Sequence, residues 1–258
     1  MIYEKKKTGL RIADIWFTDG EKPPFACDIC RYHYVKNIPS RCDSLERLYT
    51  ILIDLSRNED ELLAELDKTT KYQARRAKER DNVRTETYIA LGEKNEEKLD
   101  RYIAFFNEFA KSKDRGLICR EELEQFYDAG SLCVRSVIDT ASEMTLSMHC
   151  NVVSDGKARL HQSSSHFRGS DDADFRSLVG RANRFLHWDD ILYFKGLGIA
   201  FYDFGGWYGG NDDQEKLAIN KFKEAFGGTK TEEFSYLTPC TLIGHASVFI
   251  RKLIRGGK

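Results

Sequence analysis

The sequence predicts an α/β protein, because segments that alternate apolar and polar residues take turns with segments that repeat apolar residues at helical spacing. Ser154-Asp155-Gly156 is typical of a turn that joins two strands into a hairpin. Gly196 and Gly198 are typical of a helix end. The elements expected after residue 81 are a strand at 83–90, helices at 96–111 and 121–129, strands at 132–138, 144–153 and 157–165, a helix at 181–195, a strand at 199–204, a helix at 214–226, a strand at 234–237 and a helix or strand at 242–250.

The first 81 residues have a different pattern. Residues 1–43 are irregular, and a strand is expected at 50–55, followed by a helix that Ser56 or Asn58 caps. This helix begins with acidic residues and ends with a run of basic ones at 68–80, an order that matches the helix dipole. We expect a division near Asp81-Asn82, into segments 1–81 and 82–258.

Composition excludes several classes of protein. The 258 residues carry 40 basic and 41 acidic side chains, so net charge gives no argument for nucleic acid and a basic site must be local. The N-terminus lacks an apolar signal core, and no window has the apolar length of a membrane span. Seven cysteines without a secretion signal indicate reduced thiols and a cytoplasmic protein.

Three motifs occur in a fixed order. Residues 69–77 (TTKYQARRA) lie on the basic helix, Leu186-His187-Trp188 and 202–206 (YDFGG) follow, and 222–228 (FKEAFGG) close the series. Together they resemble the FemABX-type peptidoglycan-bridge aminoacyltransferases, over residues 56–228. The resemblance implies a GNAT-like acyltransferase fold with a splayed central mixed sheet at 82–258. It also implies a truncated first GNAT-like subdomain at 1–81, which makes the chain an N-terminally shortened member.

The resemblance implies an enzyme that transfers an acyl or aminoacyl group to an amine of a cell-envelope precursor, either peptidoglycan or polysaccharide. Such a reaction needs a group that accepts the proton of the amine and a cation or amide that stabilises the oxyanion. By resemblance, Lys223 faces the reacting ester. The splay is expected between 160–165 and 201–204, with Asp203 and His161 as further catalytic candidates. The alternatives are a surface lysine, a turn-forming aspartate and a structural histidine.

Substrate-binding candidates come from three places in the chain. The strand around residues 161–166 is unusually polar, which favours a cleft because buried polar groups without partners are unfavourable by about 1–3 kcal/mol each. Aromatic residues on the glycine-rich turn could instead simply pack. The candidates are Gln162, Ser163, Ser165, Trp207, Tyr208 and Phe222.

The donor is expected to be aminoacyl-tRNA, with acyl-CoA as the second choice, and no cofactor is expected to bind tightly. The segment 176–182 lies where acetyltransferase-like proteins bind pyrophosphate, although its spacing is one residue too long. The basic helix could bind a phosphate backbone or be a solvated helix end. The donor phosphate candidates are Arg176, Gly180, Arg181, Arg184, Lys71 and Arg75.

Two further features leave alternatives open. Cys27, Cys30, His33 and Cys42 have the residue types of a zinc site, but their spacing is tight and we expect no metal. The apolar and basic tail at 246–258 could lie on the inner face of the membrane as a peripheral contact, or dock on its own domain. The alternative to an enzyme is a non-catalytic GNAT-like module that binds a nucleotide sugar, tRNA or a protein partner.

Overall fold

The computed structural model describes residues 1–118, 120–166 and 172–256, as two compact units. The smaller unit comprises residues 1–50, 206–210 and 230–258, and the larger comprises 51–205 and 211–229. The expected boundary at Asp81-Asn82 therefore falls inside the larger unit. Among the described residues, no helix combines the length and apolarity needed to cross a bilayer.

The smaller unit is built on four strands and one helix, together with the first part of a further strand, β4 (Asp43–Asp54). β1 and β2 are antiparallel, β2 and β3 are parallel, and β3 and β10 are antiparallel. The last strand of the chain thus pairs with an early one, and the segment at 242–250, for which helix and strand were both open, is a helix. The elements are β1 (Ile2–Lys7), β2 (Leu10–Trp16), β3 (Ile29–Val35), β10 (Thr229–Pro239) and α7 (Leu242–Gly256).

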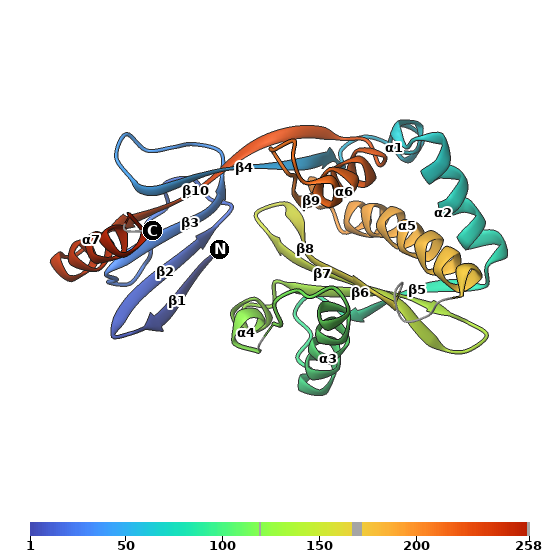
Figure 1. Ribbon diagram of the computed structural model, residues 1–258, viewed down its shortest axis with the longest axis horizontal. Coiled ribbons are helices and arrows are strands. Elements are labelled where there is room, and N and C mark those ends of the chain that lie inside the picture. Colours follow the sequence, from blue (N-terminus) through green and yellow to red (C-terminus); the bar gives the residue numbers. More distant parts are fainter. Residues whose placement is uncertain (119, 167–171, 257–258) are drawn as a thin grey trace. The chain divides into compact units, whose positions relative to one another are not determined.

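The larger unit contains the mixed sheet that the sequence predicts, in the order β4-β9-β8-β7-β6-β5. β8 and β9 are parallel, whereas β5 to β8 are antiparallel neighbours. In Figure 1, α3 and α4 lie on one face of these strands and α5 and α2 on the other. The strands are β5 (Val83–Ile89), β6 (Leu132–Asp139), β7 (Met144–Ser154), β8 (Lys157–Ser165) and β9 (Phe201–Gly206). The helices are α1 (Glu59–Glu65), α2 (Lys68–Arg80), α3 (Glu96–Ser112), α4 (Arg120–Asp128), α5 (Ala173–Gly196) and α6 (Gln214–Glu224).

Side-chain caps fix where the helices of the larger unit begin. The helix expected after residue 58 is two helices. Asn58 forms a capping box with Glu61 at the start of α1, and Asp67 accepts a hydrogen bond from the Thr70 amide at the start of α2. Asp213 caps α6 in the same way. Each cap satisfies an amide that would otherwise lack a partner, so short helices are stable here.

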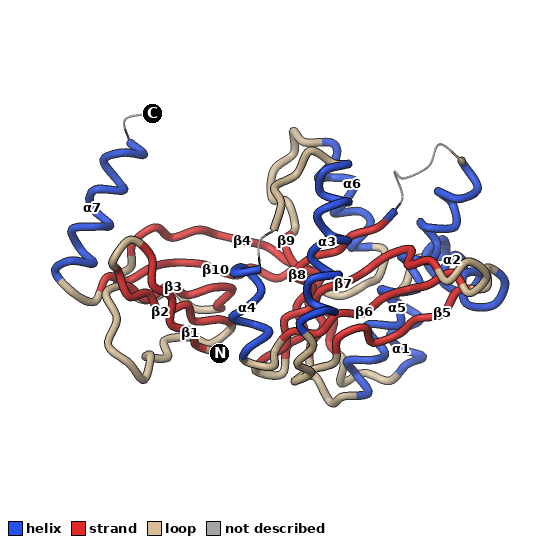
Figure 2. The backbone as a smooth tube through the Cα atoms, turned by 90° about the horizontal axis from the view of Figure 1, so that it is seen from below, coloured by secondary structure: helices blue, strands red, loops and turns tan. Residues whose placement is uncertain are grey.

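The basic helix belongs to the core of the larger unit. Ala74 and Ala77 of α2 are buried against Val83 of β5 and Val179 and Ala182 of α5. These small side chains let α2 and α5 approach each other closely. The packing joins α2 to the same unit as β5, the strand that follows it. Figure 2 looks from the α3 side and shows β5 to β8 side by side behind that helix.

Candidate active site

The central feature of the larger unit is the point where two parallel strands part. β8 and β9 pair from Lys157–Phe201 to Arg159–Asp203. Beyond this point Leu160, Ser163 and Ser165 of β8, together with Phe204 of β9, line a cleft of about 580 Å³. On β8 the splay begins at Leu160, as expected, whereas on β9 residues 201–203 are still paired and only Phe204 belongs to the parted region.

Helices from both faces of the sheet complete the cleft, which is possible because the strands no longer close the gap between them. α3 and the turn after it contribute Phe109, Lys113 and Arg115, from the face opposite α5. The remaining lining residues come from α5 and α6: Val179, Gly180, Asn183, Arg184, His187, Glu215, Ala218, Ile219, Phe222 and Lys223. Most of the wall is apolar, with a few polar groups, as is usual in a ligand pocket.

Lys223 lies in this cleft, half-buried, near the end of α6. Its Nζ donates a hydrogen bond to the carbonyl oxygen of Gly205, at 3.3 Å. Burial lowers its pKa to about 8; the Arg159 guanidinium adds to this lowering and the Asp203 carboxylate opposes it. The side chain is thus a cation at neutral pH that can lose its proton within a normal pH range. A surface lysine, the alternative interpretation, does not fit this environment.

The cleft carries more positive than negative charge. Arg184 lies against the ring of Phe222, with Cζ 4.9 Å from the centroid, and it has no carboxylate partner among the described residues. Burial lowers its pKa, with Asp67 opposing the change. Glu215 is the acidic residue of the lining, and it lies 3.7 Å from both Lys113 and Arg115. The charge left over favours an anionic ligand, such as a phosphate or a carboxylate.

His187 is a cleft residue that sequence reasoning did not select as a site residue. Its Nδ1 is buried and has no hydrogen-bond partner among the described residues. Burial lowers its pKa well below the usual range, so the ring is neutral. Its ring centroid lies 4.0 Å from that of His149, which contacts Asp190 at 2.6 Å and Asn183 at 3.0 Å. Leu186-His187-Trp188 was noted only as a motif, and helical periodicity alone could not separate His187 from a core residue.

Asp203, a catalytic candidate, is fully buried beside the cleft and is not part of its lining. Its Oδ2 contacts Arg159 at 2.5 Å and Lys157 at 3.6 Å, while its Oδ1 accepts a hydrogen bond from the Gly205 amide. Both oxygens therefore have partners. The bond to the Gly205 amide supports the alternative interpretation, a turn-forming aspartate. The structure adds that the carboxylate neutralises two buried cations.

The polar strand β8 departs from simple alternation at His161. Cys150 is opposite Gln162 and Asn151 is opposite Leu160, so His161 is the extra residue of a β-bulge. The bulge puts Leu160 and Ser163 on the same face, towards the cleft, and turns the two residues between them to the other face. Ser163 and Ser165 thus line the cleft as expected.

His161 and Gln162 consequently do not lie where a substrate-contacting role requires. The ring of His161 packs edge-on against Phe126 of α4, with centroids 5.4 Å apart, and burial lowers its pKa to about 4. Tyr102 of α3 donates a hydrogen bond to Gln162 Oε1 at 2.9 Å. The placement argues against the expectation that His161 is the general base, and favours a structural histidine.

The expected phosphate loop is also different in the structure. α5 begins at Ala173, capped by Asp172, so Gly180 lies inside the helix and not at its N-terminus. Its amide is then not free to bind pyrophosphate. The loop before this helix includes residues 167–171, which are outside the described part of the chain.

The remaining phosphate candidates divide into two groups. Gly180 and Arg184 line the cleft, whereas Arg181 pairs with Asp81 and Arg176 lies in the first turns of α5, away from the lining. Lys71 and Arg75 lie on α2 outside the cleft, among further basic residues at 68, 76, 78 and 80.

Phe222 lines the cleft, but the other two aromatic candidates do not. Trp207 and Tyr208 belong to the smaller unit. The indole of Trp207 packs against Tyr49, with centroids 6.2 Å apart, and lies 3.4 Å from the Lys230 ammonium. For Trp207 this supports the alternative interpretation, a packing role.

Comparison with known proteins gives structural but not sequence relatives. No family model matches the sequence. No curated protein matches it either. Among solved structures, FemX matches with a TM-score of 0.56 and 14% identity, over 74% of this chain and 61% of FemX, so the chain spans less than two thirds of that protein.

Two other structures are similar. One is the C-terminal domain of a putative lysylphosphatidylglycerol synthetase from Agrobacterium fabrum, with a TM-score of 0.56 and 13% identity over 98% of this chain and 84% of that one. The other is a conserved protein of unknown function from Bacteroides thetaiotaomicron, with a TM-score of 0.50 and 7% identity over 77% and 64%. At such identities the likeness concerns the fold. The chain has the α/β fold of FemX and of that synthetase domain, as its three motifs predict.

Proposed function

We propose that the protein is an acyltransferase that forms an amide on an amine of a cell-envelope precursor, peptidoglycan or polysaccharide, with an aminoacyl group as the first choice of acyl group. The observation that carries the proposal is the cleft at the parted strands, which has the half-buried Lys223 ammonium in its wall. The fold is that of FemX and of the C-terminal domain of a putative lysylphosphatidylglycerol synthetase.

The chemistry requires one bond to form and one to break. The acceptor nitrogen attacks the carbonyl carbon of the donor, the carbonyl oxygen becomes an oxyanion, and the C–O or C–S bond to the donor then breaks. The amine proton is released, and the leaving oxygen or sulfur takes up a proton. A lysine ammonium in a partly dry cleft stabilises the oxyanion more strongly than it would in water, because the effective dielectric is lower.

Two features support a phosphate-bearing donor. Arg184 offers the cleft a guanidinium without a carboxylate partner among the described residues. α2 offers a stripe of exposed basic side chains, of which Arg75 lies 4.0 Å from Glu79 and Arg76 lies 3.5 Å from Asp81. Such a stripe binds a nucleic-acid backbone without reading its sequence, which favours aminoacyl-tRNA over acyl-CoA.

An acceptor at the membrane fits the C-terminal helix. Among its described side chains, α7 exposes large apolar residues at positions 242, 243, 249, 250 and 253, while Val248 on its other side is buried against Leu10, Ile12 and Ile29. An amphipathic helix of this kind can lie in the headgroup region of a bilayer. With a tRNA donor, the reaction would take place at the cytoplasmic face.

The test is a transfer assay with purified protein, charged tRNA or acetyl-CoA as donor, and amine-bearing envelope precursors as acceptors, read by mass spectrometry. A product with one donor is expected for the wild type, and more than tenfold less for Lys223→Ala, about 1.4 kcal/mol of transition-state stabilisation or more. Lys221→Ala, on the exposed side of the same helix, is the matched control and keeps wild-type activity.

The pH profile gives an independent check on the role of Lys223. If the ammonium stabilises the oxyanion, the rate falls as pH rises through about 8, where the side chain loses its proton. Lys223→Arg retains a charge that does not titrate in this range, so its residual activity stays level there. A wild-type rate that rises through the same pH range would refute the proposed role.

The second candidate function is a non-catalytic module that binds a nucleotide sugar, tRNA or a protein partner. The placement of Asp203 and His161 favours this function. Both were catalytic candidates, and neither lines the cleft. Absence of product with every donor and acceptor pair, together with saturable binding of one donor that Arg184→Ala abolishes, would favour this module over the enzyme.

A further inference from the structure

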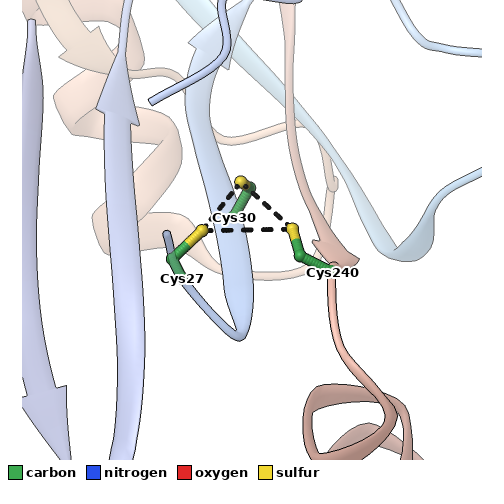
Figure 3. A group of neighbouring side chains, drawn as sticks. All are labelled: Cys27, Cys30 and Cys240. Atoms are coloured by element: carbon green, nitrogen blue, oxygen red, sulfur yellow. Dashed lines mark hydrogen bonds between the residues drawn. The ribbon is translucent and has the colours of Figure 1, made fainter. Parts of the chain in front are cut away.

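Three cysteine thiols converge in the smaller unit, two of them close in sequence and the third more than 200 residues away. Cys27 precedes β3, Cys30 lies on it, and Cys240 directly follows β10; Figure 3 shows the three sulfur atoms turned towards one another. The Sγ atoms of Cys27 and Cys30 are 3.5 Å apart, those of Cys30 and Cys240 are 3.5 Å apart, and those of Cys27 and Cys240 are 4.0 Å apart.

We propose that Cys27, Cys30 and Cys240 form a zinc site in which water takes the fourth position. A tetrahedral Zn²⁺ with Zn–S bonds of about 2.3 Å requires sulfur atoms roughly 3.8 Å apart, and the three observed distances lie on either side of that value. Thiolates are the preferred soft ligands of Zn²⁺. A disulfide would use two of these sulfurs and leave the third without a function, whereas a metal explains all three.

The ligand set differs from the one that sequence spacing suggested. His33 does not face the thiols: its Nε2 contacts Asp14 at 2.9 Å and its ring stacks on Trp16, with centroids 4.7 Å apart. Cys42 packs against the apolar cluster that contains Cys27 and Cys30, but it is not one of the three converging thiols. Sequence spacing does not point to Cys240, because 210 residues separate it from Cys30.

The backbone around the thiols is held in place before any ion binds. The amide of Cys240 donates to the carbonyl of Asp28 at 2.8 Å, and the amide of Asp28 donates to the carbonyl of Arg11 at 2.7 Å. The Asp28 carboxylate accepts hydrogen bonds from the Arg11 amide and from the Thr241 hydroxyl. This residue, between the first two cysteines, therefore connects β2, the turn before β3 and the segment after β10. Such outer contacts are what orient metal ligands.

Binding of Zn²⁺ requires the thiols to lose their protons. Burial raises the pKa of Cys27 and Cys30, so these thiols keep their protons when no ion is bound. Binding of Zn²⁺ forms three Zn–S bonds and releases three thiol protons to the buffer, with no change of oxidation state. The bound ion would join the beginning and the end of the chain within the smaller unit, and so stabilise it.

The test uses the full chain, purified under reducing conditions. Elemental analysis is expected to give about one zinc per chain, and Co²⁺ added to the metal-free protein is expected to give the intense thiolate-to-cobalt and d–d absorption of a tetrahedral site. Removing the metal with a chelator should lower the unfolding midpoint, and added Zn²⁺ should restore it. Less than a tenth of an equivalent of zinc, without a tetrahedral cobalt spectrum, would overturn the proposal.

Variants locate the ion. Cys27→Ser, Cys30→Ser and Cys240→Ser should each lose zinc, while the matched control Cys42→Ser should keep it. Full zinc in Cys240→Ser or loss of zinc in Cys42→Ser would each refute the three-thiolate site. If a variant does not fold, the cobalt spectrum of the wild type still decides. None of these measurements depends on transfer activity, so this proposal and the proposed function can fail separately.

Discussion

Replacing Lys223 by methionine is expected to make the protein more stable while abolishing transfer. The side chain is half-buried in an apolar wall with Phe204 and Phe222, and burial is the main reason that its pKa falls from 10.5 to about 8. This lowering corresponds to about 3 kcal/mol by which the folded state disfavours the ammonium. Methionine has a similar length and no charge, so Lys223→Met should raise the free energy of unfolding by up to that amount at pH 7.

The sign of the pH dependence follows from the same pKa. Because the folded pKa is below the unfolded one, the unfolded chain binds more protons between pH 8 and 10.5, and the wild type becomes more stable as pH rises through that range. The unfavourable contribution is fully present below pH 8. The advantage of Lys223→Met should therefore shrink from about 3 kcal/mol at pH 7 to about 1 kcal/mol at pH 10.

Urea unfolding of the wild type, Lys223→Met and Lys221→Met at both pH values measures this difference. Lys221 is exposed on the same helix, so its variant should change the free energy of unfolding by less than about 0.5 kcal/mol. A Lys223→Met protein that is no more stable than the wild type at pH 7, or whose gain is the same at pH 10, would refute the claim that the cleft holds a desolvated ammonium.

Three further predictions follow from the same geometry. Asp203→Asn leaves Arg159 and Lys157 buried without their carboxylate, and should lower the free energy of unfolding by about 3–5 kcal/mol in urea, an effect that a surface aspartate would not have. Ser163→Leu fills the cleft and should reduce transfer at least about tenfold without lowering stability by more than about 1 kcal/mol; Ser177→Leu, exposed on α5, is the control, and equal activity in both would place the substrate elsewhere. Phe249→Asp should weaken cosedimentation with anionic vesicles whereas Leu197→Asp should not, and unchanged sedimentation of the first would exclude a bilayer contact through α7.

The parts of the site that lie on regular elements could be predicted from the sequence. Apolar spacing predicts the helix that carries Lys223, and alternation predicts the strand that carries Phe204, whereas their meeting at a cleft was implied by the family resemblance. Buried α2 residues such as Ala74 and Ala77 also follow from helical spacing. These features depend on local patterns, which is why a single sequence was enough.

The parts that depend on distant partners could not be predicted. The pairing of β10 with β3 joins strands that are about 200 residues apart, and no local pattern encodes it. The convergence of Cys240 on Cys30 follows from that pairing. For these two features a contact that forms only in the folded chain decides the outcome. The start of α5 is a different case, because Phe175 and Leu178 already begin the apolar face of the helix before the expected start at 181.

The supernumerary residue in β8 has an evolutionary consequence. Deleting the codon for His161 would remove one of the two residues that face away from the crevice, so strict alternation would return with Ser163 and Ser165 still in the wall. The extra residue thus adds an imidazole on the α4 side of the sheet without changing the hydroxyls that a substrate would meet. Homologous chains with and without this insertion can therefore accept the same molecules although their strands differ in length.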